Sequence, residues 1–82
     1  MVSRMFGFEN GSMRSNAVIR KVLKGKLKKY RKQSGMTQEE LAHKIGVSRA
    51  YVGYLEQGRN VPSLDTLSKI ARALRVSVAD LV

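Results

Sequence analysis

The sequence lacks cysteine and tryptophan, and it contains one proline, one histidine and only six acidic residues among 82. Without cysteine the chain has no disulfide and no thiolate metal site, and the lone His43 has no second histidine with which to hold a metal ion. No apolar run is long enough to span a membrane, and the N-terminus lacks the continuous apolar stretch of a signal peptide. We therefore expect one small domain with no metal, no cofactor and no membrane association, in a reducing cytoplasm.

Basic residues are what the sequence has in excess. Sixteen Lys and Arg against six Asp and Glu give a net charge of +10, and much of the excess lies in the block KVLKGKLKKYRK, residues 21–32. Such a block suits a polyanion, either nucleic acid or an anionic membrane surface. The alternative is a solvated helix face that only sets the long-range field, and charge by itself leaves these interpretations open. The membrane interpretation is the weaker one because the apolar stripe of the same segment is needed for the core.

Helical patterns cover residues 16–82, where apolar residues recur at helical spacing. Residues 1–15, MVSRMFGFENGSMRS, have instead the Gly-, Ser- and Asn-containing composition of a flexible N-terminal arm. We expect an all-α fold of five helices, with no strand needed in the core, preceded by that arm.

The predicted helix ends are marked by residue type. The first helix begins at Asn16 or the residue before it, and Gly35 ends it. Gly25 interrupts this helix, which indicates either a close packing contact or a weak middle. The four later helices each follow a capping residue, namely Thr37, Ser48, Ser63 and Ser77. Glu40 and Asp80 stand three residues after two of these caps, which is the spacing of a capping box.

The segment IGVSRAYVGYLEQG, residues 45–58, has an unusual predicted face. Its outer side carries an arginine, two very small residues, a tyrosine and an amide, where a solvated helix would carry Lys and Glu. Only residues 46–48 join this helix to the preceding one, and a short turn with Gly is typical of a helix-turn-helix. In that motif the second helix enters the DNA major groove. Ala50 and Gly53 would let DNA come close, and Arg49 can donate two hydrogen bonds to guanine.

These residues make the chain resemble the phage-repressor-like helix-turn-helix (XRE, Cro-type) family of transcriptional regulators. The matching motifs are GMTQEELA at 35–42, GVSR at 46–49, LEQGR at 55–59 and PSL at 62–64. The resemblance spans about residues 20–82, and the combined pattern is far more specific than any one motif. It implies a five-helix lambda-repressor-like DNA-binding domain over residues 16–82.

The resemblance also implies a role for each matching residue. The base-reading positions are Arg49, Ala50 and Tyr54. The positions that contact the DNA backbone are Thr37, Gln38, Ser48, Tyr51, Gln57, Arg59 and Asn60. Gln38 would also brace the recognition helix, and Arg31 and Glu56 would form an internal salt bridge. Ala50 departs from the family, where a polar base-reading residue is frequent, and packing on neighbours is an equal alternative for Tyr51.

The function that the resemblance implies is sequence-specific binding of double-stranded DNA by a transcriptional regulator. One recognition helix reads few base pairs, so we expect a homodimer on a pseudo-palindromic operator. The candidate dimerisation residues are Val78, Leu81 and Val82; alternatively, they complete the core of the monomer. An enzyme is not expected because the sequence shows no nucleophile–base set and no metal spacing.

Two related functions stay open as alternatives. One is an antitoxin, which binds its own promoter and also a partner toxin; the arm with its Met and Phe residues is a candidate toxin-binding segment. The other is a restriction–modification controller, which is similarly small and dimeric. In each case the expected location is the cytoplasm of a bacterial or phage-type system, associated with the nucleoid through DNA.

Overall fold

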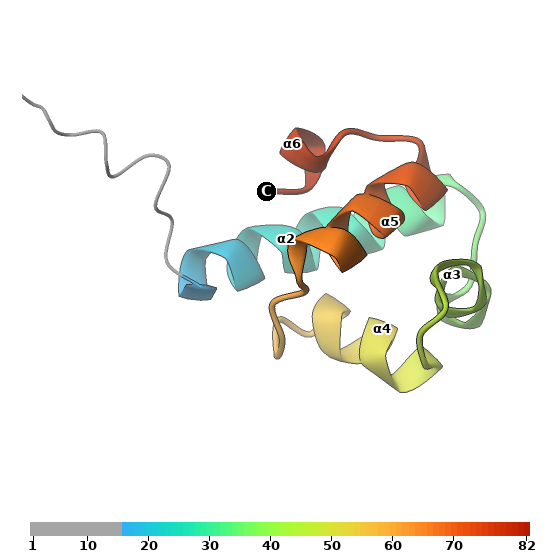
Figure 1. Cartoon of the computed structure of the whole chain (residues 1–82), viewed down its shortest axis with the longest axis horizontal. Helices are drawn as coiled ribbons and strands as arrows, with labels where there is room; N and C mark the ends of the chain where they lie inside the picture. The colour runs from blue at the N-terminus through green and yellow to red at the C-terminus, as the bar shows by residue number, and fades with distance from the viewer. Residues whose placement is uncertain (1–15) are drawn as a thin grey trace, which may run out of the picture.

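The architecture is a set of helices folded around one long helix (Figure 1). The computed structural model describes residues 16–82, and the predicted arm lies outside the described residues. The helices are α2 (Asn16–Gln33), α3 (Gln38–Ile45), α4 (Arg49–Glu56), α5 (Leu64–Leu74) and α6 (Val78–Leu81). Over these residues the predicted all-α class with five helices is confirmed.

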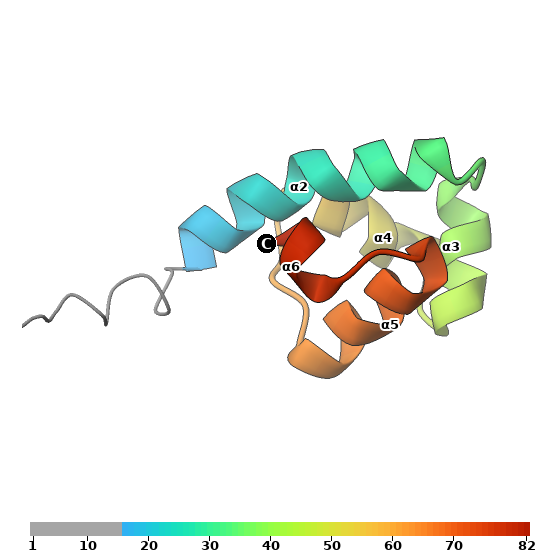
Figure 2. The same cartoon turned by 90° about the horizontal axis from the view of Figure 1, so that it is seen from above.

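The helices pack around α2 in an order that leaves α4 on one side of the molecule. α2 contacts α4 and α6, while α3 contacts α4 and α5. In Figure 1 α4 lies along the lower edge and α3 at the right-hand end, and Figure 2 shows α6 returning to lie beside α2. No helix among residues 16–82 is both long and apolar enough to cross a membrane.

The predicted helix starts are confirmed. The Thr37 hydroxyl accepts a hydrogen bond from the Glu40 N–H at 3.0 Å, and the Thr37 N–H donates to the Glu40 carboxylate at 2.8 Å, which completes the capping box. Ser77 and Asp80 form the same box at α6. The remaining caps, Ser48 and Ser63, each accept a hydrogen bond from a backbone N–H of the first turn.

Two helices have C-caps other than glycine. α4 ends at Glu56, and Gln57 is its C-cap. Arg75 caps α5 in the left-handed conformation, with a φ of 59°, a position where glycine is usual because a Cβ is strained there. The two interpretations of Gly25 in α2 are separated by its surroundings, since an added Cβ would meet nothing within 4 Å. Gly25 therefore makes no close packing contact, which leaves its low helix propensity in the middle of α2 as the remaining interpretation.

Seven side chains of the core have no solvent exposure at all. They come from every described helix: Leu23, Leu27, Leu41, Val52, Leu55, Ile70 and Leu81. Leu81 is fully buried in the monomer, which favours for this residue the alternative that it completes the core. Val78 and Val82 are partly buried and pack against the same core.

Candidate nucleic-acid interface

The turn between α3 and α4 fixes the angle between these two helices. Gly46 takes the left-handed conformation with a φ of 76°, which glycine adopts without strain. The N–H of the next residue, Val47, donates to the Ala42 carbonyl at 3.0 Å, and the Val47 side chain packs on the core. Val52 and Leu55 then anchor the inner side of α4 in the core. The outer side of α4 is thereby held toward solvent.

The outer surface of α4 is thin at Ala50 and Gly53, where the side chain is small or missing, as the sequence predicts. Arg49, Ala50 and Tyr54 are exposed. An added Cβ at Gly53 would meet nothing within 4 Å, so the packing of the protein itself does not require glycine there. A glycine inside a helix costs about 0.5–1 kcal/mol relative to alanine. The missing side chain leaves the helix backbone accessible at this position of α4.

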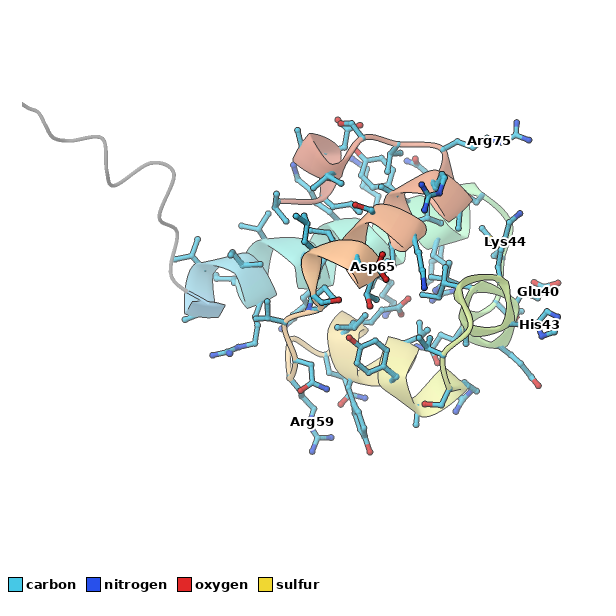
Figure 3. All side chains as sticks on the ribbon, in the orientation of Figure 1. Glu40, His43, Lys44, Arg59, Asp65 and Arg75 are labelled. Carbon is cyan, nitrogen blue, oxygen red and sulfur yellow. The ribbon has the colours of Figure 1, made fainter. Side chains whose placement is uncertain are left out.

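Four of the predicted contact residues gather where α4 ends. The Arg59 guanidinium lies over the Tyr54 ring, 4.8 Å from its centroid, and donates to the Gln57 side-chain oxygen at 3.3 Å. Asn60 joins Tyr54 and Arg59 around a shallow hollow. Figure 3 shows Arg59 pointing away from the body of the protein at the edge that α4 occupies. This end of α4 therefore presents a positive charge and two amides on the same side as the thin surface.

The other predicted backbone contacts lie at the starts of α3 and α4. The Thr37 and Ser48 side chains are exposed, and each hydroxyl accepts from its own helix, which leaves its hydrogen available to donate to a phosphate. The Thr37 backbone N–H is different: it already donates to Glu40, so it is not available for a phosphate. Tyr51 lies near the start of α4 and is half-buried, and its side chain packs against the core. Packing on neighbours is the alternative to a DNA contact for this residue.

The predicted salt bridge between Arg31 and Glu56 is confirmed. Arg31 Nη2 donates to Glu56 Oε1 at 3.1 Å, Arg31 Nε donates to Oε2, and Arg31 Nη1 donates to the Met36 carbonyl at 2.8 Å. Gln38 Nε2 also donates to Glu56 Oε1, at 3.0 Å, which confirms its bracing role and leaves its second amide hydrogen for another acceptor. Arg31 and Glu56 are 7% and 8% exposed, respectively. The network ties α2 and the start of α3 to the end of α4.

We expect the stability of the fold to fall in acid because of Glu56. Burial raises the pKa of its carboxyl, but the hydrogen bonds from Arg31 and Gln38 and the charges of Arg31 and Lys28 outweigh burial, so the net pKa is lowered. A carboxyl whose pKa is lowered by folding stabilises the fold fully at pH values above its unfolded-state pKa, about 4.3. That stabilisation is lost as the pH falls through its folded-state pKa. Urea unfolding between about pH 3 and 7 measures this loss. Glu56→Gln should flatten that part of the profile, and an unchanged profile would contradict the assignment.

Comparison with known proteins gives the family. Residues 27–81 match the helix-turn-helix family model. An uncharacterised HTH-type transcriptional regulator of Archaeoglobus fulgidus is 42% identical over 59 residues, which cover 72% of this chain and 84% of that protein. The immunity repressor protein of Bacillus phage phi105 is 40% identical over 57 residues, 70% of this chain and 40% of the repressor.

A solved structure agrees with this match. The crystal structure of the restriction–modification controller protein C.AhdI from Aeromonas hydrophila superposes with a TM-score of 0.73 and 35% identity, covering 80% of this chain and 98% of that chain. The family match includes α3, the turn and all of α4, which are the elements that form the thin, exposed surface. The chain therefore belongs to the helix-turn-helix (XRE-type) family of DNA-binding transcriptional regulators.

Proposed function

We propose that the chain is a homodimeric regulator that binds a pseudo-palindromic operator, with α4 in the major groove. The observation that carries the proposal is the outer surface of α4, where Arg49 stands beside Ala50 and a glycine that internal packing does not require. Small residues on that surface let the backbone of a helix in the major groove come close to the base edges. The regulator acts in the cytoplasm on nucleoid DNA.

We assign the contacts in two groups. Arg49, Ala50 and Tyr54 read bases, with Ala50 limited to an apolar contact such as a thymine methyl. The backbone contacts are Thr37, Gln38, Ser48, Tyr51, Gln57, Arg59 and Asn60. This assignment is supported by the exposure of Thr37 and Ser48 and by the gathering of Gln57, Arg59 and Asn60 at the end of α4. Residues 16–82 form the DNA-binding domain, and the arm expected over residues 1–15 lies outside the described residues.

Arg49→Ala tests base reading. The operator is first obtained by selecting bound DNA from a random oligonucleotide pool, and enrichment of a two-fold symmetric motif would support the dimer. On that operator the variant should lose about 1–3 kcal/mol of binding free energy and should relax the preference at one base pair per half-site. Fluorescence anisotropy with operator and random duplex measures both. An equal loss on the two duplexes would make Arg49 a phosphate contact only.

Val78→Asp tests the proposed dimer face on α6. Val78 is chosen over Leu81 of the same helix because Leu81 is buried in the monomer. Val78 is only partly buried, so an aspartate there would place a charge on the proposed interface. Sedimentation should shift toward monomer, and operator binding should become more dependent on protein concentration. Ala79→Asp, at an exposed position of the same helix, is the matched control. If both variants sediment as the wild type does, the interface lies elsewhere.

A restriction–modification controller is the second candidate. The match to C.AhdI covers 98% of that chain, so the two domains are close in size as well as in fold. The homodimeric regulator and the restriction–modification controller would use the same DNA contacts, and they would differ in the genes that they control. Adjacent genes for an endonuclease and a methyltransferase would favour the controller. Co-purification of a toxin would instead favour the antitoxin function that the sequence left open.

A further inference from the structure

The positive charge of α2 is divided between two sides of the helix. Residues two apart in an α-helix point about 200° apart around its axis. Lys24 and Lys26 therefore lie on different sides of α2, and the fully buried Leu23 and Leu27 lie between them on the core face. The two lysines flank the buried stripe, one on each side.

The Lys24 side adjoins the end of α4. A Cβ added to Gly58, just beyond α4, would lie 3.2 Å from Lys24 Cδ and 3.6 Å from the Arg20 carbonyl oxygen. Lys24, Arg20 and Lys21 line one wall of a shallow hollow of about 280 Å³, and Gln57 and Gly58 line the other. The first half of α2 is thus in contact with the segment that carries the proposed backbone contacts.

The Lys26 side adjoins α6 instead. The hydrogen bonds of Ser77 chiefly lower the pKa of the Asp80 carboxyl, and the charge of Lys26 adds to that effect. Figure 2 shows α6 beside α2. The lysines of one helix thus face different surroundings, and only one group of them borders the proposed DNA surface.

Nothing in the described protein neutralises the charges on the α4 side. α2 contains no acidic residue. Within residues 16–82, no carboxylate forms an ion pair with Arg20, Lys21 or Lys24. Arg20 and Lys24 are also four residues apart, a spacing at which like charges on a helix repel each other. A bound polyanion would remove that repulsion.

We propose that Arg20, Lys21 and Lys24 form a second phosphate-binding site, which holds the duplex backbone beyond the end of α4. These residues precede residues 27–81, to which the family model matches. It extends the backbone contacts of Gln57 and Arg59 along the same edge. The inference rests on the proposed function, since it requires α4 to lie on duplex DNA. It contributes affinity without sequence preference, because phosphates carry no base information.

The test compares two double variants that each remove two positive charges from α2. Arg20→Ala/Lys24→Ala empties the proposed site, and Lys26→Ala/Lys29→Ala is the control away from it. Alanine favours helix in both, and thermal melts confirm that each is folded. Anisotropy titrations at several salt concentrations use the selected operator and a random duplex. The site variant should reduce the slope of log K against log salt by about one for each phosphate that the protein no longer neutralises, with the same fold-reduction in affinity on both duplexes. The control variant should keep nearly the wild-type slope.

The possible outcomes separate the two proposals. Equal slope reductions in both double variants would show that α2 acts only through its total charge, and this would overturn the site. A wild-type slope in the site variant would overturn it as well, while leaving operator binding by α4 in place. Failure of the wild type itself to bind duplex DNA would overturn both the site and the proposed function.

Discussion

Glu56→Ala will lower the free energy of unfolding by about 3–5 kcal/mol, the cost of removing one partner from a buried ion pair. The reason is the environment of Arg31, which is 7% exposed and gives two of its hydrogen bonds to Glu56. Without the carboxylate the guanidinium keeps only the Met36 carbonyl as an acceptor, and the Gln38 amide loses its partner. A charge stranded away from water destabilises the fold far more than the absence of two hydrogen bonds would by itself.

The melting temperature gives the measurement. A change of about 1 kcal/mol shifts the melting temperature of a domain this size by about 4–8 °C, so Glu56→Ala should melt more than about 10 °C below the wild type. Asp65→Ala is the matched control. It breaks the exposed Asp65–Lys69 pair, which is 3.4 Å long, and exposed pairs contribute about 0–1 kcal/mol. If Glu56→Ala and Asp65→Ala have the same melting temperature, the Arg31–Glu56 pair does not hold α4 in place.

The joint replacement Arg31→Met/Glu56→Leu separates the effect of a stranded charge from that of poorer packing. Replacing a whole buried pair with apolar residues of similar size is often neutral or stabilising. The double variant should therefore retain more stability than Glu56→Ala. A greater destabilisation in the double variant would mean that the network is needed for the angle of α4 as well as for charge balance.

Local features of the fold could be predicted from the sequence because their causes lie within a few residues. The Thr37 and Ser77 capping boxes need only a hydroxyl and an acid three residues later, and both form. Gly46 ends α3 for a reason equally local, its freedom to take a positive φ. The left-handed cap at Arg75 could not be predicted this way. Its side chain does not favour the conformation, and the cap stands where the chain turns from α5 to α6, two helices that contact each other.

Features that depend on distant residues were not accessible from the residue pattern alone. Arg31 and Glu56 are 25 residues apart, and only the family resemblance paired them. Leu81 has the same apolar character whether it lies at an interface or in the core, and the docking of α6 on α2 decides that it is buried. Helical periodicity separates Lys24 from Lys26, but it does not say which of them borders α4. That assignment required the contact with Gly58.

DNA binding should weaken steeply with salt. Each basic side chain that neutralises a phosphate releases a condensed counterion, and added salt opposes that release. A dimer that neutralises about 6–10 phosphates should lose about 10³–10⁵ in affinity between about 50 and 200 mM salt. The chain is suited to this, with a net charge of +10 and Arg59 held at the edge of α4 by its contact with Tyr54.

Titrations of the operator at constant osmolality separate charge from other effects of salt. Replacing part of the salt with sucrose should restore affinity, because an uncharged solute does not compete for phosphates. A flat salt response would contradict duplex binding by this surface. Operator and random duplex should differ in affinity at every salt concentration while sharing most of the slope, because the proposal gives Arg49 a base-reading role that the backbone contacts do not have. If the difference between the two duplexes disappears with salt, the preference arises from charge density alone, and α4 does not read sequence.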